Sequence, residues 1–284
     1  MPGVTNPAAN YRCNKGSQQG YVDTMNRIHT ILTGSKCRAV NPLSLKSRIA
    51  CTVALLAGAA TLGLPAAGGL RAAEEDGVAL AIVYDTSGSM MEAVPDKNGG
   101  FSPKYIIANR ALISIAAQIE KTATNAASGP PPKIMAGLYI FDGTQAKAVV
   151  KFGSFDAAAI EKWASSFSKP AGGTPLGNAL LIAGRAVLDS PLSRKHVLFI
   201  TDGINTLGPP PTQVIPQLNQ LAEAKTNAIS IHFVALGVNT REFEGVKRLG
   251  ATVVGASDEA ELDSQLQFIL QNQILLEKEE PTKH

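Results

Sequence analysis

Three segments of this 284-residue chain carry hydroxyl and carboxylate side chains of the kind that bind a hard metal ion. In the first, Asp85, Ser87 and Ser89 alternate along a short polar run directly after an apolar stretch. The second places Thr174 in a glycine-rich loop, and the third places Asp202 directly after another apolar stretch. The glycines of the second segment permit a close approach of the backbone. These side chains form an oxygen site only if the fold brings the three segments together.

The elements that would position these segments alternate between short apolar runs and longer amphipathic runs. Near-continuous apolar runs are typical of strands that are buried on both faces. We expect such strands at residues 78–84, 134–141, 195–200 and 229–236. We expect helices at residues 103–122, 157–167, 176–188, 212–224, 240–249 and 259–275.

Strands and helices in alternation predict an α/β fold, doubly wound, with a mainly parallel central sheet that is flanked by helices. In such a sheet the ligand crevice lies at the carboxyl ends of the strands. Asp85 and Asp202 each follow a predicted strand and Thr174 precedes a predicted helix, so all three should open on that edge. Taken singly, each residue is better explained as a turn or cap residue. The interpretation as a site depends on their joint occurrence.

The pattern Asp-x-Ser-x-Ser, followed by a Thr and then by an Asp, resembles the metal-ion-dependent adhesion site (MIDAS) of the von Willebrand factor type A (VWA) family. Every element has a match, in the family's order and strand context, over roughly residues 77–276. The resemblance implies a Rossmann-like VWA fold. It also implies a metal site formed by Asp85, Ser87, Ser89, Thr174 and Asp202, with the hydroxyls as direct ligands and the two Asp residues acting directly or through waters.

The resemblance further implies what the metal would do. Mg²⁺ prefers octahedral oxygen coordination and retains waters. Because hydroxyl ligands are neutral, the ion would keep residual positive charge and an open position, which an acidic residue from a protein partner would complete. We expect Mg²⁺ on availability, with Mn²⁺ as the alternative. The polar loop at residues 92–102 lies beside this site, either as a contact for the partner or as an ordinary surface loop.

Composition argues against several other functions. Residues 1–71 carry eight Lys or Arg and one acid, whereas residues 72–284 carry 18 basic and 22 acidic side chains, which does not favour nucleic-acid binding. All three cysteines precede residue 72, which excludes a catalytic cysteine or a thiolate metal site after it. We interpret His196 and His232, which lie inside predicted strands, as core residues and not as ligands or bases.

Residues 49–70 contain no charged side chain and follow several Lys and Arg residues. Such a stretch is typical of a secretory signal or a membrane anchor. We favour cleavage near Ala72 or Ala73; the alternatives are an uncleaved anchor and a buried Ala-rich core helix. The chain then divides into a basic extension (1–48), a signal or anchor (49–73), the VWA domain (77–276) and a polar tail (277–284). The domain would be exported to the periplasm or to the outside of the cell.

We therefore expect a bacterial, exported or membrane-tethered VWA module that is not an enzyme and meets the membrane only through its N-terminal segment. It would bind a protein partner through the cation, as an adhesion or assembly factor of the cell envelope. Two alternatives stay open. One is a phosphohydrolase, which needs a general base or a second metal beside Asp85 and Asp202. The other is a structural module in which the metal only stabilises the fold.

Overall fold

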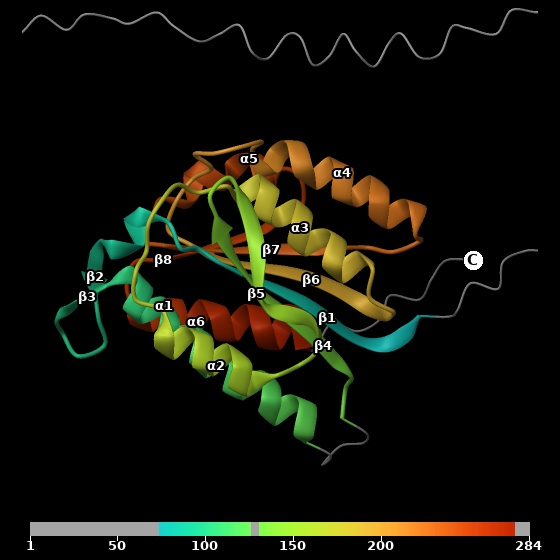
Figure 1. Cartoon of the computed structure of the whole chain (residues 1–284), viewed down its shortest axis with the longest axis horizontal. Coiled ribbons are helices and arrows are strands. Elements are labelled where there is room, and N and C mark those ends of the chain that lie inside the picture. The colour runs from blue at the N-terminus through green and yellow to red at the C-terminus, as the bar shows by residue number, and fades with distance from the viewer. Residues whose placement is uncertain (1–73, 126–130, 276–284) are drawn as a thin grey trace, which may run out of the picture. The chain divides into compact units, whose positions relative to one another are not determined.

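A six-stranded sheet organises the part of the protein that the computed structural model describes, residues 74–125 and 131–275 (Figure 1). The strands lie in the order β5-β4-β1-β6-β7-β8, and every neighbouring pair is parallel except β4 with β5. This confirms the predicted α/β fold with a mainly parallel central sheet. The strands are β1 (Glu75–Tyr84), β4 (Ile134–Asp142), β5 (Gln145–Ser154), β6 (Leu192–Thr201), β7 (Ser230–Leu236) and β8 (Thr252–Ala256). The described residues all belong to the unit Gly68–His284.

Helices cover both faces of the sheet, as Figure 1 shows. One face carries α1 (Lys104–Thr124), α2 (Ala157–Ser166) and α6 (Glu259–Ile269), and the π-helical turn η3 (Leu270–Leu275) continues α6. The other face carries α3 (Leu176–Leu188), α4 (Pro211–Ala224) and the short α5 (Glu244–Lys247), which follows the 3-10 turn η2 (Thr240–Phe243). Two apolar clusters, one on each side of the sheet, form the core.

The packing of the central strand β1 on both of its faces explains why its sequence is apolar at consecutive positions. Residues 78–84 are at most 1% exposed. Leu80 and Ile82 belong to the cluster under α1 and α6, whereas Ala81 and Val83 belong to the cluster under α3 and α4. A strand that is covered on both faces has no solvent side that favours polar residues. Packing on both sides therefore fixes the carboxyl end of β1, where the first candidate segment begins.

A small hairpin follows that segment and is fastened to α6. It consists of the 3-10 turn η1 (Gly88–Met91) and the paired strands β2 (Ala93–Pro95) and β3 (Phe101–Pro103). The buried carboxylate of Glu259 accepts a hydrogen bond of 3.0 Å from the backbone N–H of Lys97 and two of 2.8 Å from the Arg110 guanidinium. Burial alone would raise the pKa of Glu259, but these donors outweigh it and hold that pKa below its usual range. The hairpin is thus held beside the carboxyl edge of the sheet.

The four strands and most helices that the sequence predicts are present, α3 with the same bounds. The single helix predicted at residues 240–249 is wrong, because that segment forms η2 and a one-turn α5 and is followed by Gly250 at a φ of +90°. The loop predicted at 92–102 contains the hairpin strands β2 and β3. The edge strands β5 and β8 have no counterpart in the prediction.

None of the helices within the described ranges is long and apolar enough to cross a membrane. The signal or anchor predicted at residues 49–73, like the extension at 1–48, lies outside the described residues.

Candidate functional site

The structure places Asp85, Thr174 and Asp202 at the same edge of the sheet, the carboxyl edge that the sequence predicts. Asp85 follows β1 directly, and Asp202 follows the neighbouring parallel strand β6. Two backbone hydrogen bonds bring in the loop that carries Thr174. The N–H of Ala171 donates to the carbonyl of Thr86 over 2.8 Å, and the N–H of Gly88 donates to the carbonyl of Gly172 over 3.0 Å.

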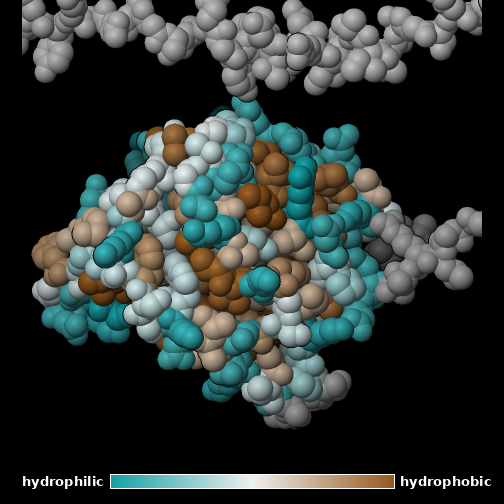
Figure 2. All heavy atoms as spheres, in the orientation of Figure 1, coloured by the Kyte–Doolittle hydropathy of each residue, from teal (hydrophilic) through white to brown (hydrophobic). Residues whose placement is uncertain are grey.

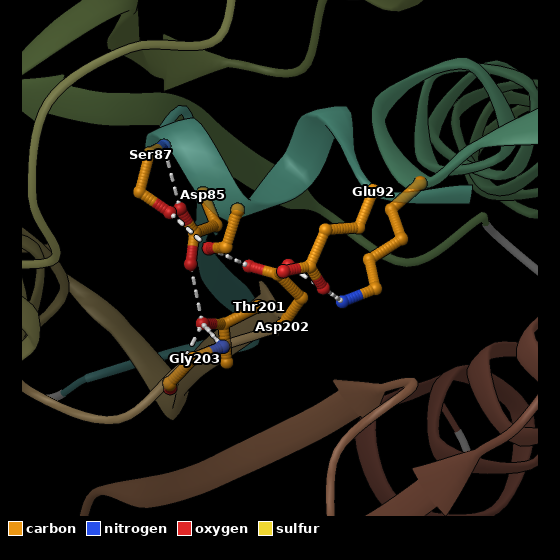
Figure 3. A network of polar contacts seen from close by, with 8 residues as sticks. Asp85, Ser87, Glu92, Thr201, Asp202 and Gly203 are labelled. Atoms are coloured by element: carbon orange, nitrogen blue, oxygen red, sulfur yellow. Dashed lines mark hydrogen bonds and ion pairs between the residues drawn. The ribbon is translucent and has the colours of Figure 1, made fainter. Parts of the chain in front are cut away.

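A row of hydrogen bonds joins the first segment to the third (Figure 3). The hydroxyl oxygens of Ser87 and Ser89 lie 3.0 Å apart. The Ser89 hydroxyl donates to Oδ1 of Asp202 over 2.8 Å. Three of the five predicted ligands therefore form one continuous row, although Ser89 and Asp202 are 113 positions apart in sequence.

Asp85 lies behind this row and is fully buried. Its Oδ1 accepts the backbone N–H of Ser87 over 2.7 Å, and its Oδ2 accepts the hydroxyl of Thr201 over 2.6 Å (Figure 3). Burial raises the pKa of Asp85 to about 6; the nearby Asp202 adds to this rise, and the hydrogen bonds from Ser87 and Thr201 oppose it. A buried carboxylate that is costly to ionise gains most from a cation close by.

Thr174 is held by its backbone. Its N–H donates to the Thr206 hydroxyl over 2.8 Å, and its carbonyl accepts the N–H of Thr206 over 3.0 Å. A Cβ added to Gly203 would lie 3.5 Å from Oγ1 of Thr174 and 3.8 Å from Oγ of Ser89. The two hydroxyls thus flank one small space that the absence of a side chain on Gly203 leaves open.

A buried lysine, Lys104, contacts the site through its side-chain ammonium. Nζ of Lys104 lies 2.9 Å from Oδ2 of Asp202 and 2.7 Å from Oε2 of Glu92. The lysine side chain is 3% exposed and the Glu92 side chain is 68% exposed. Burial lowers the pKa of Lys104, but the hydrogen bonds and charges of Glu92 and Asp202 outweigh it and raise that pKa above its usual value. Figure 3 shows the Glu92 and Asp202 side chains lying close together at this point.

The geometry of the row fits a six-coordinate Mg²⁺. Ligand oxygens at 2.0–2.1 Å from an octahedral ion lie about 3 Å apart along each edge of the octahedron. The separations of 3.0 Å between Ser87 and Ser89 and of 2.8 Å between Ser89 and Asp202 are hydrogen-bond lengths that are also close to that edge, so the row could exchange its hydrogen bonds for a shared ion. No group of three or more His, Cys, Asp or Glu within the described ranges is placed to hold a metal ion. A metal here would therefore depend on the hydroxyls, as the donor set predicted from the sequence does.

Three residues that hydrogen-bond to the predicted metal ligands were not identified from the sequence. Thr201 orients Asp85, Thr206 orients Thr174, and Lys104 bonds to Asp202. Thr201 carries a signal in the sequence, since it immediately precedes Asp202 at a strand end. No local pattern indicates that Lys104 is buried, because lysine is among the residues that are least often found inside a protein.

The two strand histidines lie in the core, as predicted. His196 and His232 are 0% and 3% exposed, and Nδ1 of the first lies 3.3 Å from Nε2 of the second. His196 precedes Thr201 by five residues on β6, which is about 16 Å along the strand. The histidine pair is therefore remote from the edge that carries the candidate site.

Comparison with known proteins finds solved structures with a similar fold. No family model and no curated protein sequence matches the chain. Among solved structures, the PilB minor pilin from Streptococcus sanguinis has a TM-score of 0.52 at 17% sequence identity, with 69% of this chain and 61% of the pilin covered.

Two other matches have lower TM-scores. Proximal thread matrix protein 1 from the mussel byssus, solved with a zinc-occupied MIDAS motif, gives a TM-score of 0.48 at 16% identity, with coverage of 70% and 48%. The SpRpn10 VWA domain gives 0.46 at 14% identity, with coverage of 67% and 93%.

This chain thus spans about three fifths of the pilin's length and about half of the mussel protein's. At these identities, the likeness to the pilin shows the fold alone. The chain shares with it an α/β fold built on a mainly parallel sheet that is flanked by helices.

Proposed function

We propose that this protein is an exported or membrane-tethered VWA module that binds a protein partner through a divalent cation. The cation would be Mg²⁺ or Mn²⁺, held by Asp85, Ser87, Ser89, Thr174 and Asp202. The observation that carries the proposal is that segments 113 positions apart bring the oxygens of Ser87, Ser89 and Asp202 into one row. Their separations of 3.0 and 2.8 Å are hydrogen-bond lengths that an octahedral shell can also accommodate.

The charges of the site favour an acidic partner. The predicted donors contribute three neutral hydroxyls and two carboxylates, and Oδ2 of Asp202 is already bonded to the Lys104 ammonium. The two carboxylates formally balance a divalent ion, but Asp202 also pairs with Lys104, and Glu92, which is mostly exposed, offsets the lysine charge only in part. The ion therefore keeps some positive charge. A carboxylate is the protein side chain that supplies both the missing oxygen and the missing negative charge.

The surface beside the site favours a protein over a small molecule. Met91 and Ile204 each lie two residues after a predicted ligand and are 53% and 49% exposed. Phe101, on the hairpin strand β3, is 74% exposed, and Figure 2 shows apolar atoms on the surface over this hairpin. Apolar side chains exposed beside a polar site are available for contact with a protein partner.

The phosphohydrolase alternative needs a general base at the metal. His196 lies about 16 Å along β6 from that edge. The further carboxylate beside the site, Glu92, accepts a hydrogen bond of 2.7 Å from the Lys104 ammonium, which lowers its pKa and so its strength as a base. On this ground we propose that the protein is not an enzyme. The export of the domain and its role in adhesion or assembly at the cell envelope are proposed from the apolar segment at residues 49–70.

The test uses Mn²⁺, which replaces Mg²⁺ and is paramagnetic. Purified full-length protein is titrated with MnCl₂ by calorimetry, and the relaxation of water protons then reports exchangeable waters on the bound ion. We expect one site, and we expect acetate, a minimal carboxylate, to displace water from it. Asp85→Ala and Thr174→Ala should abolish Mn²⁺ binding, both with and without acetate. Ser190→Ala, which removes a buried hydroxyl at the opposite end of β6, should not.

The outcomes separate the three functions. Exchangeable water that acetate displaces supports a partner-binding site. Bound metal with no exchangeable water indicates a structural ion, and turnover of p-nitrophenyl phosphate that the two site variants lose indicates a hydrolase. Either of these results refutes the proposal, as does the absence of Mn²⁺ binding with and without acetate.

A further inference from the structure

Lys104 is placed in the site by features that a surface lysine does not need. It is the first residue of α1, where the positive end of the helix dipole disfavours a cation. Its stem passes Gly237, since a Cβ at that position would lie 2.9 Å from Cε of Lys104 and 3.1 Å from Val94. Gly237 has a φ of +68°, a conformation that glycine adopts without strain. The absence of a side chain at Gly237 thus leaves room for the Lys104 stem, whose ammonium reaches Asp202.

Asp202 is shared between the row and the lysine. Its Oδ1 accepts from Ser89, and its Oδ2 accepts from Lys104 over 2.9 Å. A carboxylate with a donor on each oxygen is held in one orientation. Lys104 therefore keeps the third predicted segment in register with the first without any help from a metal ion.

The same ammonium is a fixed positive charge one carboxylate away from the proposed cation. Like charges separated by a few ångströms repel strongly where burial limits the screening by water. Glu92, the second carboxylate bonded to Lys104, is mostly exposed and offsets this charge only in part. A divalent ion that enters the site meets both the attraction of the two Asp residues and the repulsion of Lys104.

We propose that Lys104 is a positioning residue that holds the metal-free site assembled and weakens divalent-cation binding until a partner carboxylate arrives. This inference rests on the proposed function and adds regulation to it. The carboxylate of the partner supplies the negative charge that Lys104 offsets, so metal and partner each raise the affinity of the other by the same factor. The protein alone would hold the cation weakly, and the complex would hold it tightly.

The decisive variant is Lys104→Met, which keeps the length of the side chain and removes its charge. We expect calorimetry with MnCl₂ to show an affinity about tenfold higher than that of the wild type, as expected for removal of a nearby like charge. We also expect acetate to increase Mn²⁺ affinity less in this variant than in the wild type. Lys195→Met is the matched control, because Lys195 is an equally buried lysine bonded to Glu74 and to backbone carbonyls at the amino end of β6.

A second variant covers the case in which Lys104→Met does not fold. Glu92→Gln changes an exposed side chain, leaves the bond between Lys104 and Asp202 in place and removes the charge that offsets the lysine. We expect Mn²⁺ affinity to fall about threefold, a small effect because Glu92 is exposed to solvent. An unchanged or higher affinity contradicts the inference.

The remaining outcomes distinguish this inference from the proposed function. Mn²⁺ binding by the wild type that Lys104→Met leaves equal or weaker overturns the regulatory role alone and leaves the metal site standing. Binding by Lys104→Met in the absence of acetate, together with binding by the wild type only in its presence, supports the regulatory role. Absence of binding in both proteins, with and without acetate, overturns the metal site and this inference with it.

Discussion

Replacing Asp85 by Asn should stabilise the metal-free protein at neutral pH, although it damages the proposed site. Asp85 is fully buried, and its pKa is raised from 3.8 to about 6, chiefly by burial. At pH 7 the native state must hold this carboxylate ionised. One pKa unit corresponds to about 1.36 kcal/mol, so the shift corresponds to about 3 kcal/mol of lost stability.

The direction of the pH dependence follows from where the proton is bound. Between about pH 4 and pH 6 the native state keeps the Asp85 proton and the unfolded state has released it, so this group makes the free energy of unfolding fall as pH rises. Below pH 4 both states hold the proton, and above pH 7 neither does. The stability of the wild type relative to Asp85→Asn should therefore fall by about 3 kcal/mol between pH 4 and pH 7 and then stay constant.

The assay is urea unfolding in EDTA at a series of pH values. Trp163 is the single tryptophan of the chain and lies 5.1 Å from the ring of Tyr84, the residue before Asp85, so its fluorescence reports this region. At each pH the free energy of unfolding of Asp85→Asn is subtracted from that of the wild type, which cancels the contributions of the other titrating groups. In Mg²⁺ at pH 7 the difference between the two proteins should shrink to near zero, because a ligand at one hundred times its dissociation constant stabilises the wild type by about 2.7 kcal/mol, close to its deficit of about 3 kcal/mol. A difference in EDTA that stays constant from pH 4 to pH 7 refutes the reasoning.

Three further predictions concern two glycines with close neighbours and the ion pair of Arg110 with Glu259. Gly203→Ala should weaken Mn²⁺ binding in calorimetry without lowering the thermal midpoint, because its methyl group occupies the space between the two flanking hydroxyls at ordinary contact distances. Gly177→Ala should lower the free energy of unfolding by more than about 2 kcal/mol in urea, because its Cβ would lie 2.0 Å from the carbonyl oxygen of Pro209. Arg110→Ala should cost about 2 kcal/mol in the same assay, because it leaves the buried Glu259 carboxylate with fewer donors. If Glu259→Gln and the double variant Arg110→Ala/Glu259→Gln lose the same free energy of unfolding, the two side chains act as one unit.

The sequence predicted the central part of the fold because burial there leaves a clear pattern. β1 and β6 are covered on both faces, so their apolar residues run continuously. α3 begins after Pro175 and buries a stripe of small and branched residues, and its bounds match the prediction. The first predicted ligand segment follows β1, the second precedes α3 and the third follows β6. Their meeting at one edge was therefore predictable as well.

The edge of the fold was not predictable in the same way. β5 pairs with β4 alone and has exposed side chains such as Lys147 and Lys151, so its apolar signal is weak. The segment at 240–249 divides into η2 and α5 between Phe243 and Glu244, where the sequence contains neither a glycine nor a proline. Contacts between distant residues left no local signal either, which is why the bond from Lys104 to Asp202 was missed.

The distance in sequence between the parts of the site has a consequence for folding kinetics. Ser89 and Asp202 are 113 positions apart, and the strand that carries Asp202 enters the sheet beside β1. A site of this kind has high contact order, so it cannot form before the chain has closed that long loop. We expect a bound cation to slow global unfolding and to have little effect on the rate of folding, because its ligands come together only after the rate-limiting step. In the exported protein that we propose, the ion would then slow unfolding of the finished fold, and chelation would shorten the lifetime of the whole domain and not of one loop.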